Sequence, residues 1–332
     1  MTISKFLRRT ALTVAMVSAP AALWAQEQVI RAVTFTPANV MYAEHFAVFV
    51  ERVNEAGEGV VRIDIIGGPE TIPMQNMGEA QMNGIADMFN LPPGLYLDLI
   101  PEGEAFAGSN RTPMENRANG GLEFINTIFR EKANAHVLAH VSAGAGFNIF
   151  LSREPSFDDD GNLDLDGYRI RSAPLYRAFF EALGATAVVM PAGEIYTSLE
   201  RNVVDGTGYT IAGVRDFGWD RFLTHRIDPE FFQTDVLISM NHDAWAGLSD
   251  EAQAILNEVA EDFERYSFDL VAEETASEAA AMEEGGMQVI ELTGDQREAY
   301  LDAAYTVTWE RLRSRDATHY DALRELFFDE DL

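Results

Sequence analysis

Strand-like and helix-like spacings of hydrophobic residues alternate along the first third of the chain. A β-rich run at residues 29–35 precedes residues 46–53, where phenylalanine and valine recur at the i, i+3, i+4, i+7 spacing of one buried helical face. Residues 61–65 then alternate between hydrophobic and polar side chains, which is typical of a half-buried strand. Strands that alternate with helices predict a largely parallel α/β sheet, whose ligands bind beyond the carboxyl ends of its strands.

The middle of the chain repeats this order of elements. Residues 147–152, 168–172 and 186–190 have the composition of strands, and apolar residues at helical spacing separate the last two. The sequence SDEA at residues 249–252 is typical of a helix start, and a long helix is expected after it. A short strand at residues 287–292 and two amphipathic helices complete the chain. The pattern therefore predicts two α/β units.

The N-terminus has the pattern of a secretory signal peptide. Three basic residues precede an apolar run at residues 10–24, and Ala25 provides a small residue for cleavage before Gln26. No later stretch reaches the ~18 apolar residues that a membrane-spanning helix needs. We therefore predict a signal peptide at residues 1–25 and a mature protein that is soluble in the periplasm.

The chain is strongly acidic and contains no cysteine. It has 24 basic and 54 acidic residues and a formal net charge of −30, which becomes −33 without residues 1–25 because these carry three basic residues and no acidic one. Such a surface repels phosphate backbones and anionic lipids, which argues against nucleic-acid and membrane partners. An anionic ligand needs a local site of positive charge, so each arginine is a candidate for that role.

Motifs for catalysis, cofactors or metals are absent from the sequence. It contains no Walker loop, no G-x-G-x-x-G and no G-x-S-x-G. His136 and His140 lie in a segment with strand composition, where side chains four residues apart do not converge on a metal. The acidic run at residues 158–164 has the composition of a calcium loop, but Gly167 falls where the bidentate glutamate is required. We therefore expect no enzyme, no cofactor and no bound metal.

Four spaced motifs occur in one order in the middle of the chain: GYRIR at residues 167–171, ALGA at 182–185, EIYTSL at 194–199 and VDG at 204–206. In this order they resemble the solute-binding subunits of TRAP (tripartite ATP-independent periplasmic) transporters. The resemblance extends over most of the mature chain. It implies an α/β, periplasmic binding protein-like fold, in which two α/β domains are joined by hinge strands and a long helix and enclose a ligand cleft.

The resemblance also implies domain boundaries and a hinge. The expected units are residues 26–147 plus 236–282 for domain I and residues 148–235 plus 283–332 for domain II. We expect the hinge near residues 147–151 and 235–240, where the linking strands cross between the domains.

Arg171 matches the arginine that holds a ligand carboxylate in this family. A planar guanidinium offers parallel N–H donors that fit a carboxylate, which a lysine cannot do. The alternative is an interdomain salt bridge between Arg171 and one of the many acidic residues. Asn148 and Tyr209 are further expected ligand contacts, because they occupy positions that are charged in many members of the family. The remaining candidates follow predicted strands in the N-terminal half: Asn39, Glu70, Asn90 and Tyr96. Tyr42 also lies at such a position.

The expected function is capture of a small organic carboxylate and its delivery to the TRAP membrane permease subunits. Asn148 replaces a second arginine and Gly208-Tyr209 replaces a pair containing glutamate, so we expect one bound carboxylate and no metal bridge. Monocarboxylates should therefore bind better than dicarboxylates. Two alternatives are a periplasmic binding protein that serves a sensor and a secreted hydrolase or isomerase.

Overall fold

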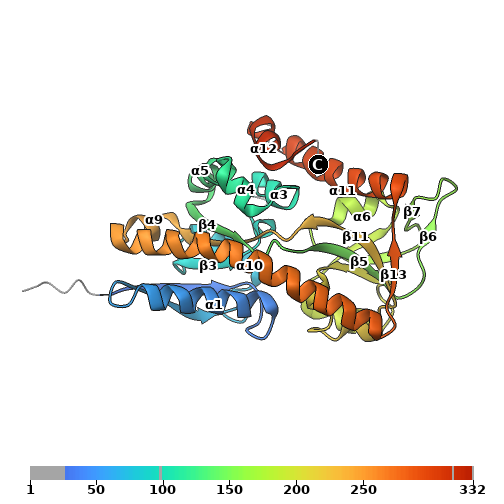
Figure 1. The fold of residues 1–332 in the computed structure, drawn as a ribbon, viewed down its shortest axis with the longest axis horizontal. Helices are drawn as coiled ribbons and strands as arrows, with labels where there is room; N and C mark the ends of the chain where they lie inside the picture. The colour runs from blue at the N-terminus through green and yellow to red at the C-terminus, as the bar shows by residue number, and fades with distance from the viewer. Residues whose placement is uncertain (1–26, 97–98, 316–317, 331–332) are drawn as a thin grey trace, which may run out of the picture.

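A computed structural model describes residues 27–96, 99–315 and 318–330, and the predicted signal peptide at residues 1–25 lies outside the described residues. Within the described ranges the chain forms two mixed sheets and a small hairpin (Figure 1). The first sheet has the order β2 (Val61–Gly67), β1 (Gln28–Thr34), β3 (Met88–Leu91), β12 (Val236–Asn241), β4 (Ala135–Val141). The second has the order β13 (Gln288–Glu291), β11 (His225–Gln233), β5 (Gly146–Leu151), β10 (Gly206–Tyr209), β8 (Arg169–Ser172), β9 (Thr186–Val189). The hairpin pairs β6 (Ser156–Phe157) with β7 (Leu163–Asp164).

Both sheets are more mixed than the largely parallel sheet expected from the sequence. Every antiparallel pair between described strands of the two sheets involves β5 or β12. These are the strands by which the chain enters one sheet directly from the other. Such a strand begins at the edge where its neighbours end, so it runs against them.

Helices cover both faces of the first sheet. Helix α1 (Met41–Ala56) and the first half of α10 (Asp250–Glu284) pack on one face, where the predicted apolar face at residues 46–53 is buried as expected. The other face is covered by α5 (Gly121–Ala133), with short helices around it. These are α2 (Met77–Met82), α3 (Glu104–Ala107), α4 (Pro113–Ala118), η1 (Met74–Asn76), η2 (Pro93–Leu95) and η3 (Pro101–Gly103). Helix α9 (His242–Ala246) packs on the side of α1 and α10, where Trp245 joins their core.

The second sheet is also covered on both faces. Helices α6 (Arg177–Ala182) and α11 (Gly294–Arg315) pack on one face. On the other lie α7 (Ile195–Glu200), α8 (Ile211–Val214), η4 (Ala192–Glu194), η5 (Trp219–Arg221) and the end of α10. No helix in the described ranges combines the length and apolar character needed to cross a membrane.

Helix α11 belongs to the cores of both units. Tyr300 and Ala304 pack into the core of the second sheet, whereas Trp309 and Leu312 pack into that of the first, as does α12 (Tyr320–Phe327). The expected boundaries assign all of residues 283–332 to domain II. We propose instead that the boundary falls within α11, so that the last helix belongs to domain I.

Two short segments cross between the sheets beside α10. Residues 142–145 join β4 to β5, and residues 234–235 join β11 to β12. The first crossing therefore precedes the expected hinge segment at 147–151, which is strand β5 itself. A Cβ on Gly144 would lie 1.9 Å from the Phe268 carbonyl oxygen, so only glycine lets this crossing approach α10 so closely.

Candidate functional site

The parallel strands of both sheets end at the edges where the sheets face each other. Strand β4 leads directly into β5, and β11 leads directly into β12. Strand β5 runs antiparallel to β10, and β12 runs antiparallel to β3. Strands β1, β3, β8 and β10 therefore end where the chain crosses between the sheets. This is the position at which α/β proteins bind ligands.

Arg171 lies at this edge, near the end of β8, and no described residue serves as its counter-ion. The residue is 5% exposed. Its Nε donates to the Met190 carbonyl at 3.0 Å, and its Nη1 donates to the Tyr176 hydroxyl at 2.7 Å and to the Gly208 carbonyl at 3.3 Å. No carboxylate among the described residues pairs with Arg171, so the salt bridge considered as an alternative does not form. Nη2 keeps its two N–H groups for a ligand.

Arg226 is the other buried arginine in the described part of the chain, and its charge is compensated. It is 4% exposed and donates to Asp228 at 2.8 and 2.9 Å and to Glu283 at 3.1 Å. Arg169, on the same strand as Arg171, also pairs with an aspartate. An unpaired buried charge costs several kcal/mol of desolvation. The missing counter-ion of Arg171 is therefore the feature that marks a site for an anion.

The strand register places three predicted ligand residues on one face of the second sheet. Arg171 pairs with Thr207, and Tyr209 pairs with Asn148. Side chains alternate along a strand, so Thr207 and Tyr209 share a face, and so do residues paired across adjacent strands. Arg171, Tyr209 and Asn148 therefore lie on the same face. Asn148 is two strands away from Arg171 and two residues further along β10, a separation of about 12 Å.

Asn148 contributes a hydrogen-bond acceptor to this face. It is fully buried, and its Nδ2 donates to the Ile227 carbonyl at 3.0 Å and to Asp228 Oδ1 at 2.8 Å. Its Oδ1 has no hydrogen-bond partner. Buried polar atoms are nearly always paired in native proteins, so this oxygen is suited to accept a hydrogen bond from a ligand.

Tyr42 connects the two units at the same edge. It lies in the first turn of α1, and its hydroxyl is 3.2 Å from Oγ1 of Thr210, the residue after β10. The ring of Phe35 packs against Tyr42 at 5.5 Å. Burial raises the pKa of Tyr42 and of Tyr209 far above the usual value, so both hydroxyls stay protonated and can donate hydrogen bonds.

Tyr176 and Asp235 complete the cluster, although the sequence analysis did not select them. The Tyr176 hydroxyl accepts from Arg171 and donates to the Gly208 carbonyl at 2.9 Å. Asp235, on the second crossing, is 4% exposed, and its Oδ2 has no partner. Burial raises the pKa of Asp235 to about 7. Its charge in turn raises the pKa of Tyr42 and of Tyr176. Asp235 lies where the chain passes from β11 of the second sheet to β12 of the first, so it belongs to the edge that both units share.

Two predicted residues of the first sheet are buried in different settings. Asn90, at the end of β3, is 1% exposed and its Oδ1 accepts from Thr34 Oγ1 at 3.3 Å. It therefore lies at the edge that faces Arg171. Tyr96 is 1% exposed in the core below α5, where its hydroxyl donates to Gln81. Tyr96 is thus committed to the interior of its own unit, and we omit it from the proposed site.

Glu70 and Asn39 are exposed residues of loops. The pKa of Glu70 is lowered because its carboxylate accepts hydrogen bonds from the backbone N–H groups of Glu70 itself and Gly68. It therefore stabilises the loop after β2. Asn39 lies in the loop before α1 and makes no side-chain hydrogen bond to a described residue. Neither residue joins the cluster around Arg171.

The histidines singled out by the sequence have structural roles. Strand β4 carries both, as expected. His136 stacks on Trp245 at 4.1 Å, and His140 Nε2 lies 2.7 Å from the Thr234 carbonyl. Burial lowers the pKa of each to about 4. Across the described ranges no group of three or more metal-ligating side chains occurs.

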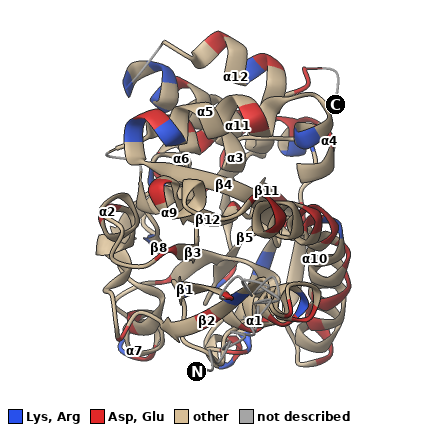
Figure 2. Cartoon of the chain, turned by 90° about the vertical axis from the view of Figure 1, so that its left-hand side faces the viewer, with Lys and Arg blue, Asp and Glu red and all other residues tan. Residues whose placement is uncertain are grey.

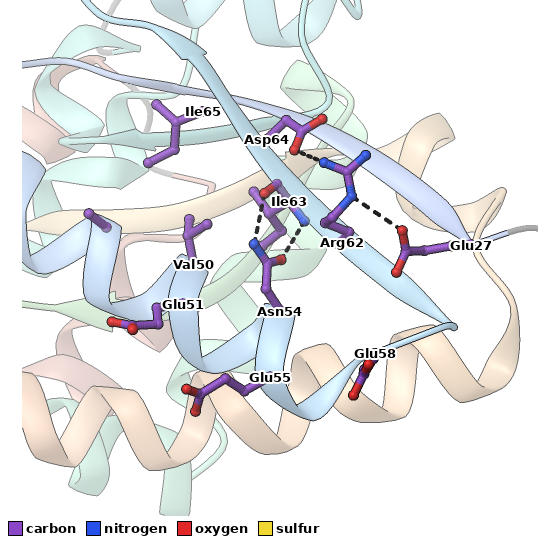
Figure 3. A pocket seen from close by; sticks show the side chains of 11 residues that line it. Glu27, Val50, Glu51, Asn54, Glu55, Glu58, Arg62, Ile63, Asp64 and Ile65 are labelled. Atoms are coloured by element: carbon purple, nitrogen blue, oxygen red, sulfur yellow. Dashed lines mark hydrogen bonds and ion pairs between the residues drawn. The ribbon is translucent and has the colours of Figure 1, made fainter.

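A large surface groove lies elsewhere, between α1 and β2 (Figure 3). It measures about 920 Å³. Its single basic side chain, Arg62, is held by Glu27 and Asp64. Three further glutamates line the groove. Aspartate and glutamate residues also recur along α10 (Figure 2). These surfaces repel an anionic ligand, which leaves the interior edge at Arg171 as the candidate site.

A family model supports a binding function. The model of the DctP family, described as bacterial extracellular solute-binding protein family 7, matches residues 32–314. A solute-binding protein of Roseobacter denitrificans is 26% identical over 237 residues, which cover 70% of this chain and 68% of that protein. The 2,3-diketo-L-gulonate-binding periplasmic protein YiaO of Escherichia coli is 30% identical over 201 residues, covering 53% and 59%.

Two further comparisons agree. The ectoine-binding periplasmic protein TeaA of Halomonas elongata is 24% identical over 232 residues, covering 67% of this chain and 64% of that protein. The crystal structure of a Bordetella pertussis extracytoplasmic solute receptor that binds pyroglutamic acid superposes with a TM-score of 0.77 at 14% identity, covering 90% of this chain and 99% of that one. This last likeness supports the two-domain periplasmic-binding fold.

Proposed function

The chain belongs to the DctP family of bacterial extracellular solute-binding proteins, and we propose that it holds its ligand between its two α/β units with Arg171 as the carboxylate-binding group. As a member of this family it is an extracytoplasmic solute receptor of a TRAP transporter, and it is not an enzyme. Such receptors bind small organic acids and deliver them to the membrane permease subunits. Family membership favours this role over a sensor-linked or hydrolytic one.

The observation that carries the proposal is the buried, unpaired charge of Arg171. A tyrosine hydroxyl and carbonyl oxygens surround it, and no carboxylate of residues 27–96, 99–315 or 318–330 pairs with it. A ligand carboxylate on Nη2 would compensate that charge. Charge-assisted hydrogen bonds contribute ~1.5–3 kcal/mol each, so two of them on Nη2 account for much of the affinity of a small ligand.

The surrounding residues are suited to a ligand with one carboxylate. Asn148, Tyr209, Asn90 and Tyr42 provide neutral acceptors and donors. A second carboxylate would be buried without a cation, at a cost of several kcal/mol. Diketogulonate, ectoine and pyroglutamate, the ligands in the names of three relatives and neighbours, each have one carboxylate.

Binding measurements on purified protein test this proposal. A thermal-shift screen of organic acids identifies ligands, because a ligand that binds only the folded state raises the melting temperature. Calorimetry then compares wild type with Arg171→Ala, for which we expect affinity to fall at least ~100-fold. The control is Arg169→Ala, two residues earlier on the same strand, where Arg169 is exposed and paired with Asp205. Equal affinities for Arg171→Ala and wild type would remove Arg171 from the site.

The family also locates the protein in the periplasm. We propose that residues 1–25 are the signal peptide that directs it there, supported by the order of basic residues, apolar run and Ala25. N-terminal sequencing of the protein exported by its host should then begin at Gln26. A mature protein that starts at Met1 would contradict the cleavage.

A further inference from the structure

Asp235 is the second buried charge in the cluster for which the described residues supply no partner. It is 4% exposed, its Oδ2 makes no hydrogen bond, and no described arginine, lysine or histidine pairs with it. By contrast, the buried acids Glu104 and Glu264 are paired with Arg311 and Arg117. An isolated buried carboxylate costs several kcal/mol and persists where it has a use.

The crossing segment fixes the position of this carboxyl group. Immediately before it, the backbone N–H of Thr234 donates to the Ala145 carbonyl at 3.0 Å, and the Thr234 carbonyl lies 2.7 Å from His140 Nε2. Val236, immediately after it, pairs with Val141 in the first sheet. Asp235 is therefore held between two anchored residues and cannot move to solvent without disrupting the crossing.

Asp235 and Arg171 lie at the same edge, Asp235 on the crossing between β11 and β12 and Arg171 near the end of β8, and no salt bridge joins them. The hydroxyl of Tyr176 is hydrogen-bonded to Arg171, and the pKa of Tyr176 responds to the charge of Asp235. The pKa of Asp235 itself is raised by burial and lowered only by its own backbone N–H. The site thus contains one buried cation and one buried acid at separate positions, each without a counter-ion in the described part of the chain.

We propose that Asp235 selects ligands that carry a cationic nitrogen, so that the site binds zwitterions with the carboxylate on Arg171 and the nitrogen on Asp235. This inference rests on the proposed function of Arg171. A zwitterion compensates both buried charges at once, whereas a simple anion leaves Asp235 without a partner. Charge-assisted hydrogen bonds from N–H to a carboxylate are among the strongest in proteins.

Two matched pairs of ligands test the proposal by calorimetry at pH 7.5. L-proline and cyclopentanecarboxylate have the same ring size and carboxylate but differ in the cationic nitrogen. Ectoine and pyroglutamate are small rings with one carboxylate, of which only ectoine is zwitterionic. We expect the zwitterion of at least one pair to bind ~10-fold or more tightly than its anionic counterpart.

Asp235→Asn should weaken binding of that zwitterion about 100-fold and change binding of the anions less than about 3-fold. The control is Glu230→Gln, on β11, because Glu230 is a partly buried acid whose Oε2 accepts from the Gly146 N–H at 2.8 Å. It should leave both affinities unchanged. The melting temperature of each variant without ligand shows that it folds.

Proton release provides a second test on the unmodified protein. Around Asp235, Tyr42 and Tyr176 have raised pKa values, and His140 is neutral because burial lowers its pKa to about 4. At pH 6, below the pKa of about 7 of Asp235, binding a zwitterion should release close to one proton. Calorimetry in buffers of different ionisation enthalpy measures this release, which should vanish in Asp235→Asn.

The possible results separate this inference from the proposed function. If neither zwitterion binds more tightly than its anionic counterpart, or if Asp235→Asn weakens both classes equally, the role of Asp235 is wrong. Loss of anion binding in Arg171→Ala would still support the proposed function in that case. If Arg171→Ala leaves every ligand unaffected, the proposed function itself fails.

Discussion

Replacing Asp235 by asparagine should stabilise the ligand-free protein, increasingly so as the pH rises. Burial raises the pKa of Asp235 to about 7, against ~3.9 in an unfolded chain. The folded state therefore holds the proton more tightly than the unfolded state. The stability contributed by this proton is fully present below pH ~4 and is lost as the pH rises through 7.

The magnitude follows from the difference of about three pKa units. At 1.36 kcal/mol per unit, ionisation of Asp235 lowers the free energy of unfolding by on the order of 4 kcal/mol above pH 8. At pH 5, Asp235 is already ionised in the unfolded chain but still protonated in the folded protein. The free energy of unfolding is therefore already lower there by about 1.5 kcal/mol than below pH ~4. The advantage of Asp235→Asn over wild type should therefore grow by roughly 3 kcal/mol between pH 5 and pH 8.

Urea unfolding of both proteins at several pH values measures this difference, and comparison at equal pH cancels the other carboxylates. The control is Asp205→Asn, where the sign is reversed. A hydrogen bond from Arg169 lowers the pKa of Asp205, so Asp205 stabilises the fold above ~pH 4 and loses this effect at lower pH. An advantage of Asp235→Asn that does not change with pH would show that Asp235 is not desolvated in solution, and the reasoning would be refuted.

Other expected outcomes concern binding and motion. Arg171→Lys should recover only part of the affinity lost in Arg171→Ala by calorimetry, because lysine keeps the charge but cannot reach the Met190 carbonyl and a ligand together. Tyr42→Phe should weaken ligand binding ~3–10-fold and speed dissociation in stopped-flow experiments, since it removes the hydrogen bond to Thr210. Monocarboxylates should outcompete succinate and malate, because Asn148 supplies no charge, and the opposite order would contradict the one-carboxylate site. The radius of gyration from small-angle scattering should fall when ligand binds wild type, and an unchanged curve at saturation would mean that the domains do not close.

The sequence alone determined the fold class and the family, and it selected the arginine that we propose as the carboxylate-binding group. Periodicity identified the helix at residues 46–53 and the strand at residues 61–65 because burial of one face requires a fixed spacing of apolar side chains. The four motifs in the middle of the chain identified the family because their order and spacing are specific. Arg171 was then accessible to prediction, since it lies within one of these motifs.

Only the tertiary structure decided which polar residues share an environment with Arg171. Asn90 and Tyr96 both follow apolar strand residues in the sequence, yet Asn90 lies at the facing edge and Tyr96 lies in the core. Asp235 directly precedes an apolar strand, and the sequence gives no sign that it lacks a partner. Whether an acidic side chain is buried and has a counter-ion depends on which distant segments of the chain pack against it.

The crossings between the sheets also show which features the sequence predicts and which depend on tertiary structure. The sequence indicates strands at residues 147–152 and 236–240 but not the direction in which each enters its sheet. Strands β5 and β12 run antiparallel to their neighbours because the two sheets lie close together. One crossing has only four residues and the other only two, so each strand begins at the edge where the chain arrives. Local side-chain patterns set which residues form an element, whereas packing of distant segments sets how elements meet and which charges remain unpaired between them.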